Sequence, residues 1–262
     1  MPFMRMRFKF LAAMAGAVFA SGVCLGQTAS FSSQSSADAF VDSSQPNSNF
    51  GAAGAMAVSA SGLPQGEFQS VLLFDLSGAA NSFNAQFGVG GWALQSVTLQ
   101  LTASPHGNAI FNNVAAGQFN VSLMQNNSWV EGTGTGGKPT TDGISFNSLL
   151  SVYVNNAADQ GLGTFSFAGT TSGQDSYGLT LSSGLVSDVT SGSDASLRLY
   201  AADSSVSYLF DSRTGGSSTA DEPTLTMQVV AVPEPGSVAL CVAALVVLGL
   251  LQAFRRGSRR ND

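Results

Sequence analysis

The stretch SLRLYAADSSVSYLFDS, Ser196–Ser212, contains two short runs in which apolar and polar residues alternate. In the first run, Leu197 and Leu199 fall on one side of an extended chain, and Arg198 and Tyr200 fall on the other. Asp and Ser residues separate the two runs, as is typical of a turn. The pattern predicts two neighbouring β-strands, each with one face toward a hydrophobic core.

Runs of the same kind recur along the chain between Gln27 and Val230, with Gly, Ser, Asn, Asp or Pro between them. No 11-residue window predicts an amphipathic helix, and oppositely charged pairs four residues apart are nearly absent. We therefore predict that residues 27–230 form one all-β domain, an antiparallel β-sandwich or jelly roll. The further runs are residues 71–76, 96–103, 119–125, 151–156, 164–169, 177–182 and 224–230.

The N-terminus has the pattern of an export signal. Three basic residues among the first nine precede an apolar run, Phe10–Val23, which is too short to span a bilayer comfortably. Cleavage after Gly26 would make residues 1–26 a signal peptide. The alternative is a lipoprotein signal with Cys24 as the lipid acceptor, although Val23 stands where such signals usually have Gly or Ala.

The C-terminus has the pattern of a membrane anchor. Residues 236–254 are almost entirely apolar and long enough to cross most of a hydrocarbon core as a helix. A basic cluster follows at once, which by the positive-inside tendency places the tail in the cytoplasm and the body outside. A buried core helix is the alternative, but no later segment is available to fold over it. The basic residues are Arg255, Arg256, Arg259 and Arg260.

The motif Val232-Pro233-Glu234-Pro235, followed by this apolar span and arginine cluster, resembles the PEP-CTERM sorting signal of bacteria. The resemblance covers Val232–Arg260, so we assign residues 231–262 to a sorting signal, and it implies processing by an exosortase in a cell that makes extracellular polysaccharide. Prolines fix φ and favour extended backbone, so the two prolines would present Glu234 in an exposed rod beside the membrane. The alternative is an ordinary stiff linker before an anchor.

The body between the two ends is acidic. Between Gln27 and Val232 there are three Lys and Arg residues and fourteen Asp and Glu residues, a formal charge of 3 − 14 = −11. Such a surface repels phosphate backbones, which argues against nucleic acid as a partner. Both cysteines, Cys24 and Cys241, lie in the terminal segments, so no disulfide is expected in the body.

Several strings in the body resemble DNRLRE domains. That resemblance implies a jelly-roll module linked to carbohydrate binding. An Arg that usually precedes the Phe-Asp strand is replaced near Gln69 and Ser70, and a Trp expected after the Glu-Gly-Thr turn is missing. The matching strings are Ala37–Asp42, Pro46–Gly51, Ser70–Leu76, Ala93–Leu101, Ser128–Thr133, Phe210–Arg213 and Glu222–Leu225.

Catalytic motifs are weak. Gly132–Lys138 fits the spacing of a phosphate-binding loop, but Pro139 stands where Ser or Thr should bind Mg²⁺. His106 is the only histidine, and no G-x-S-x-G elbow is present for a hydrolase. Paired carboxylates could serve a polysaccharide-acting enzyme, with Glu131 as one candidate. We expect no enzymatic activity.

Two kinds of ligand site are considered instead. Asp38, Asp42 and Asp211 are candidate calcium ligands, since hard cations prefer oxygen, although no D-x-D-x-D-G loop is present. Tyr200 and Tyr208 could form a platform for sugar rings, with Trp129 as a further candidate. The alternative is that the aspartates belong to turns, that Trp129 anchors a turn, and that the tyrosines cap the core.

These features predict an exported protein at the cell surface or in the extracellular matrix, transiently held in the membrane by its C-terminal helix. We expect it to be non-catalytic and to contact extracellular polysaccharide, with exosortase and the export machinery as further partners and no cofactor other than a possible calcium ion. The alternatives are a purely structural or adhesive protein without sugar affinity, or a polysaccharide-acting enzyme.

Overall fold

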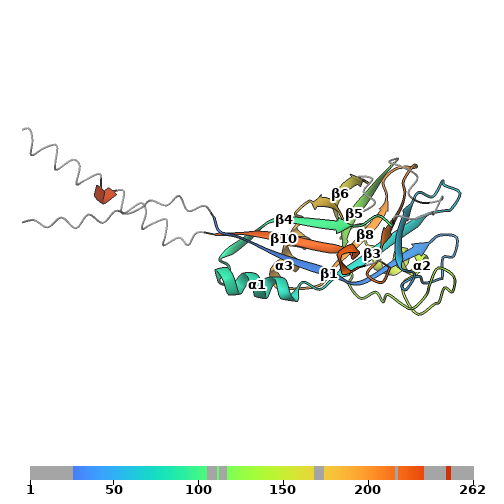
Figure 1. The fold of residues 1–262 in the computed structure, drawn as a ribbon, viewed down its shortest axis with the longest axis horizontal. Helices are drawn as coiled ribbons and strands as arrows, with labels where there is room; N and C mark the ends of the chain where they lie inside the picture. The colour runs from blue at the N-terminus through green and yellow to red at the C-terminus, as the bar shows by residue number, and fades with distance from the viewer. Residues whose placement is uncertain are drawn as a thin grey trace, which may run out of the picture.

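The computed structural model describes residues 26–104, 111, 117–167, 174–215, 218–232 and 246–248. Most of this chain forms antiparallel β-sheet, with ten strands in a nearly closed arrangement (Figure 1). The expected all-β architecture is confirmed in this respect. The strands are β1 (Thr28–Asp42), β2 (Ala55–Ser59), β3 (Phe68–Phe74), β4 (Trp92–Leu101), β5 (Gln118–Met124), β6 (Gln160–Ser166), β7 (Asp175–Leu179), β8 (Ala195–Ala201), β9 (Ser207–Asp211) and β10 (Thr224–Ala231).

Strand β1 joins two sheets. Its first half pairs with β10, from Thr28 opposite Val230 to Gln34 opposite Thr224, and β10 continues to β4 and β7. Its second half pairs with β3, after a register shift at Ser35, and β3 continues to β8, β5 and β6. A bulge of this kind bends a strand and increases its twist, which lets one strand belong to both sheets. Strand β2 pairs with β3 and β9.

The inward-facing side chains of both sheets form one hydrophobic core. Phe119 of β5 lies at its centre, within 5.3 Å of the Tyr177 ring of β7 and 5.8 Å of the Phe210 ring of β9. In β8, Leu197 and Leu199 are fully buried in this core, so the predicted alternation is confirmed. Two helices add Phe83 and other apolar residues to it; they are α1 (Ser77–Phe87) and α3 (Ser183–Ser191).

These helices correct the expectation that the body contains none. The sequence of α1 is built from Ser, Gly, Ala and Asn, with Phe83 as its fully buried aromatic residue, so its apolar stripe is narrow. Helix α3 begins at a Ser182 cap that accepts a hydrogen bond from the Leu185 amide, and it ends at Gly192 in the left-handed conformation. The narrow apolar stripe of α1 and the capping residues of α3 are weak sequence signals, and the runs on either side of them are strongly β-like. The two helices were therefore not predicted.

A second apolar cluster lies on the outer face of the β3–β8 sheet. Residues 125–154, which we call the covering segment, contribute Trp129, Ile144 and Leu149 to it, and β1 and β3 contribute Val41 and Val71. The segment includes α2 (Phe146–Ser148) and a π-helical turn, η1 (Leu149–Tyr153). The predicted strand at residues 151–156 is therefore wrong, because a Ser145 capping box starts a helical turn that buries Leu149.

Among the described residues, no comparable segment covers the outer face of the β1–β10–β4–β7 sheet. Its outward positions are exposed or half-buried and carry mainly Ser, Thr and Gln, with Gly178 at one edge and the apolar Val230 and Ala93 near the end of β10. We call it the neutral face. Its rows across the strands are Ser30–Gln228–Ser96, Ser32–Thr226–Thr98–Gly178 and Gln34–Thr224–Gln100–Ser176.

Other predicted runs overlap observed strands. Residues 71–76, 96–103, 119–125, 164–169, 177–182 and 224–230 overlap β3, β4, β5, β6, β7 and β10. The expected signal peptide lies outside the described residues except for Gly26, and only residues 246–248 of the expected membrane segment are described. Within the described part of the chain, no helix has the length and apolar character needed to cross a bilayer.

Candidate functional site

Arg213, Glu131 and Asp38 meet where β1 leaves β10, and we call these three residues the Arg213 cluster. The guanidinium of Arg213 donates to both carboxylate oxygens of Glu131, and this is the salt bridge found among the described residues. Glu131 Oε1 also accepts the backbone N–H of Asp38 at 3.1 Å. The Arg213 and Glu131 side chains are 34% and 17% exposed, so water screens the pair only partly.

The Asp38 carboxylate lies under this pair and is 1% exposed. One oxygen accepts the Arg213 backbone N–H at 2.8 Å and the Ser35 hydroxyl at 3.3 Å, and the other oxygen has no hydrogen-bond partner. Burial raises the pKa of Asp38 to about 6, against the opposing effect of the Arg213 amide. The hydrogen bonds that Arg213 donates to Glu131 raise the pKa of Arg213. The cluster therefore holds a strong ion pair over a carboxyl group that ionises reluctantly.

Asn49 fixes the two loops beside this cluster. Its buried amide donates to the carbonyls of Glu131 and Ile144 at 2.6 and 2.9 Å. Its side-chain oxygen accepts the backbone N–H groups of Gly51 and Gly134, each at 3.1 Å. All four hydrogen-bonding positions of the amide are thus used. A side chain at Gly134 would collide with the Asn49 backbone, which explains the small residue there.

The Arg213 cluster and Asn49 bring together strings that are far apart in the sequence. Ala37–Asp42, Pro46–Gly51, Ser128–Thr133 and Phe210–Arg213, four of the strings that carry the resemblance to DNRLRE domains, all contribute to it. Both carboxylate oxygens of Glu131 accept from Arg213, and one of them also accepts the Asp38 amide. The arrangement closes the free edge of β1, where Phe40 also pairs with Phe50, and so protects an edge that could pair with another chain.

The structure gives the three candidate calcium ligands separate surroundings. Asp42 accepts the backbone N–H and the hydroxyl of Ser44 and so closes its own turn. Asp211 is a buried residue of β9 whose amide donates to Thr102, and Asp38 belongs to the Arg213 cluster. Among the described residues, no group of three or more His, Cys, Asp or Glu side chains is placed to hold a metal ion.

Two of the three candidate aromatic residues lie inside the molecule. Trp129 is 4% exposed and donates its indole N–H to the Ser196 hydroxyl at 2.9 Å. Tyr208 is 1% exposed, packs against Phe119, and donates its hydroxyl to the Gly117 carbonyl at 2.7 Å. The expected platform of Tyr200 with Tyr208 is therefore wrong, because Tyr208 faces the core and Tyr200 faces outward. Trp129 anchors the covering segment.

Tyr200 lies in a polar row on the outer face of β3 and β8. The Arg198 guanidinium lies 4.3 Å from the centre of the Tyr200 ring. Arg198 Nε donates to Gln69 at 2.7 Å, and the Gln69 amide donates to Glu67 at 2.6 Å. Burial lowers the pKa of Arg198. We call these four residues the Tyr200 row. The sequence analysis noted Gln69 only as a departure from the DNRLRE pattern, since its contact with Arg198 joins residues 129 positions apart.

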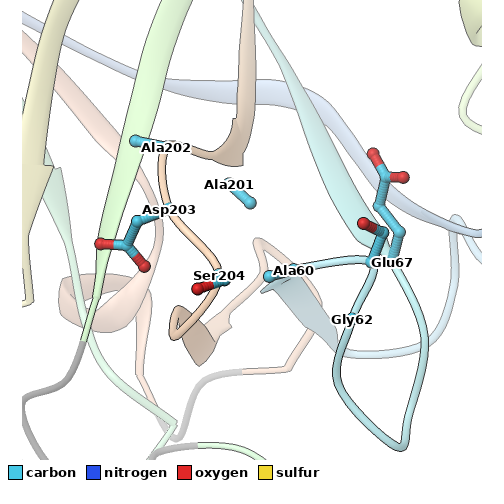
Figure 2. Close-up of a pocket in the computed structure, with 8 residues that line it drawn as sticks. Ala60, Gly62, Glu67, Ala201, Ala202, Asp203 and Ser204 are labelled. Carbon is cyan, nitrogen blue, oxygen red and sulfur yellow. The ribbon is translucent and has the colours of Figure 1, made fainter.

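An open hollow of about 410 Å³ adjoins the Tyr200 row. The turn after β8 forms one side, and the segment between β2 and β3 forms the other. Figure 2 shows Glu67 and Asp203 on opposite sides of it. Asp203 is engaged by the backbone N–H groups of Gln118 and Ser205, both at 2.7 Å. The volume of the hollow lies within the usual range for small-ligand sites. The hollow is shallow and is lined by polar residues and alanines.

Several predicted site residues lie outside the described part of the chain. In the sorting motif, Val232 is described and donates its amide to the Gly91 carbonyl at 2.8 Å. His106 and both cysteines are outside the description as well. The other residues in this group are Pro233, Glu234, Pro235, Arg255, Arg256, Arg259 and Arg260.

Comparison of the chain with protein-family models and with curated proteins found no match.

Proposed function

We propose that this chain is an exported, non-catalytic protein of the cell surface or extracellular matrix that contacts polysaccharide through the Tyr200 row and the adjoining hollow. Its body would be a jelly-roll module, and its C-terminal segment would anchor it in the membrane until an exosortase processes Val232-Pro233-Glu234-Pro235. The observation that carries the binding proposal is the Tyr200 row itself, an aromatic ring with polar side chains on an outward sheet face beside an open hollow.

The chemistry of the row suits a sugar. Aromatic rings take up the apolar face of a sugar ring, and guanidinium and carboxylate groups hydrogen-bond its hydroxyls. The Gln69 amide is 2% exposed, so its part is to hold Arg198 and Glu67 in place. Three of the four groups are already linked to one another, so their side chains lose less freedom when a ligand binds. The acidic body favours neutral polymers over anionic ones, because like charges repel.

A polysaccharide-acting enzyme is the second candidate, and one observation favours it. Glu67 and Asp203 flank the hollow, and glycoside hydrolysis uses a pair of carboxylates across the scissile bond. However, Asp203 already accepts two backbone N–H groups that hold the turn after β8. Glu131, the carboxylate named from the sequence, does not line the hollow.

The binding proposal is tested by affinity electrophoresis of the full chain, kept in solution by a detergent without a sugar head group. Gels contain soluble cellulose derivatives, xylan or alginate, each run with calcium and with EDTA. We expect retardation by a neutral polymer and a roughly tenfold weaker affinity for Tyr200→Ala, which corresponds to about 1.4 kcal/mol. Tyr208→Phe is the matched control, because it alters a buried tyrosine. If no gel slows the wild-type chain, a structural protein without sugar affinity is favoured instead.

The same samples separate the enzyme from the binding protein. Release of shorter sugar chains that stops in both Glu67→Gln and Asp203→Asn, while binding persists, would favour catalysis. Sorting is tested in cells by replacing Pro233, Glu234 and Pro235 with Ala. We expect the altered chain to remain in the membrane fraction, whereas the wild-type chain is processed. Equal processing of both would remove the sorting proposal.

A further inference from the structure

The neutral face offers a second surface with a different chemistry from the Tyr200 row. Its central row is Ser32–Thr226–Thr98, and the next row is Gln34–Thr224–Gln100. These side chains point away from the core, since their neighbours along each strand, such as Leu225 and Met227, are fully buried. Successive rows lie roughly 6.6–6.8 Å apart along the strands. Within one row, residues on neighbouring strands lie about 4.7–4.9 Å apart.

No position in these rows carries a charge, although the body has a formal charge of −11. The acidic side chains therefore lie in the loops, the helices and the other parts of the molecule. This difference matters for a neutral partner. Covering a carboxylate removes its hydration at high cost, whereas hydroxyl and amide groups can exchange water for the hydroxyls of a polymer. A neutral polymer can therefore cover these rows without removing water from a carboxylate.

The polar side chains of this face are ordered by hydrogen bonds to one another. Thr226 donates its hydroxyl to Gln100 at 3.1 Å, and the Ser32 and Thr226 hydroxyl oxygens are 2.9 Å apart. Because the Thr226 proton is committed to Gln100, Ser32 must be the donor in this second pair. The chain of bonds leaves the Gln100 amide N–H groups as donors and the Ser32 oxygen as an acceptor. Sugar hydroxyls both donate and accept, so they match such a surface.

We propose that the neutral face binds a neutral, hydroxyl-rich polysaccharide chain lying across β1, β10 and β4. This inference rests on the proposed function and deepens it, since it names the class of polymer and adds a second surface. The two sheets share one core, so the neutral face and the Tyr200 row point away from each other. A molecule that holds polymer on both faces links two chains.

The test measures retention of the full chain on cellulose, xylan, galactomannan and alginate, in the same sugar-free detergent. Thr226→Glu places a charge in the central row, and Gln228→Glu adds a charge with almost no change of shape. We expect each to weaken retention on a neutral polymer at least tenfold. Ser187→Glu, on the exposed side of α3, is the matched control and should stay within twofold of wild type. Thermal unfolding confirms that each variant is folded.

The outcomes separate this inference from the proposed function. If Tyr200→Ala loses retention while Thr226→Glu and Gln228→Glu keep it, the neutral face is not a binding surface and the proposed function stands. If the wild-type chain is retained only on alginate, the neutral class of polymer is wrong. If no polymer retains the wild-type chain, both proposals fall. Cross-linking is measured by the aggregation of polymer-coated beads. The wild-type chain should aggregate the beads, whereas Tyr200→Ala and Thr226→Glu, which each disable one face, should not.

Discussion

The outer faces of the two sheets differ in a way that follows from their outward residues. On the β3–β8 sheet, Val71 and Leu73 point outward, and the covering segment lies over them. On the β1–β10–β4–β7 sheet, the outward positions carry mainly Ser, Thr and Gln, and among the described residues no apolar segment packs over them. Apolar outward residues must be buried, whereas neutral polar ones are satisfied by water. Whether a sheet is covered is thus decided by side chains that do not face the main core.

The covered face depends on buried and half-buried polar side chains that hold its loops in place, and the neutral face has no such loops among the described residues. The covering segment is held down by Trp129 and Leu149, but its loops are positioned by Asn49 and by the Arg213 cluster. If this contrast is correct, changes to the covered face should cost much stability and changes to the neutral face very little. The following predictions test the contrast on the free energy of unfolding, measured by urea denaturation.

The largest effect is expected for Asn49→Ala. This change leaves two backbone N–H groups and two carbonyls without partners, and each buried orphan costs about 1–3 kcal/mol. We expect a loss of about 4 kcal/mol or more. Asn47→Ala is the control, because the exposed Asn47 side chain contacts only Asn147 in a hydrogen bond between two side chains. Equal losses for the two variants would mean that Asn49 does not hold the loops.

The next largest effect is expected for Leu149→Ala in the covering segment. Leu149 is fully buried in the second apolar cluster, and removing such a side chain from a packed core costs about 2–5 kcal/mol. We expect about 3 kcal/mol. The exposed Leu150 is the matched control, and Leu150→Ala should change stability by less than about 0.5 kcal/mol. A small loss at Leu149 would show that the covering segment is not packed on the sheet.

Asp38 should make stability depend on pH. Its pKa is about 6 in the folded chain, against an ordinary value of 3.8, so the folded state keeps the proton to higher pH. Stability from this group is therefore full below about pH 4, falls as the pH rises from 4 to 6, and stays low above that range, a change on the order of 2–3 kcal/mol. Asp38→Asn should flatten the curve over this window. The half-exposed Asp188, whose pKa burial also raises to about 6, should contribute in the same direction but less because water screens it. An unchanged curve in Asp38→Asn would contradict the raised pKa.

The smallest effect is expected for Thr226→Val on the neutral face. The substitution removes one hydroxyl that donates to Gln100, but both groups can bond to water instead, and Val favours strands. We expect a change within about 0.5 kcal/mol in either direction. A loss as large as that of Leu149→Ala would mean that the neutral face is covered after all.

The sequence predicted the strands well where alternation is strong and poorly where it is not. In β8, bulky Leu alternates with Arg and Tyr, and the strand and both of its faces were predicted. The first half of β1 is mainly Ser with small residues, and its strand character comes from pairing with β10 rather than from its own composition. Residues 151–156 contain β-prone Val and Tyr, but the Ser145 cap and the burial of Leu149 set the local structure.

The candidate sites were harder to predict because they depend on distant contacts. Nothing local in the sequence shows that Glu131 meets Arg213, 82 residues away, or that Gln69 joins Arg198. The alternation in residues 196–200 predicted that Tyr200 faces away from the core, whereas the position of Tyr208 between Val206 and Phe210, which share its buried face, was not used. The neutral face could have been noticed, since Ser, Thr and Gln recur at every second position of residues 30–34 and 224–228.

The pairing of the first and last strands has a mechanical consequence. Strand β10 lies between β1 and β4, and its end at Ala231 lies beside the start of β1 (Figure 1). Tension on the chain beyond Val232 therefore pulls β10 lengthwise against both neighbours. Hydrogen bonds of an antiparallel ladder lie across the strands, so they share such a pull in shear rather than opening one after another. A polymer held across β1, β10 and β4 would therefore pass its tension to the proposed C-terminal anchor through β10, with the ladders to β1 and β4 sharing the load.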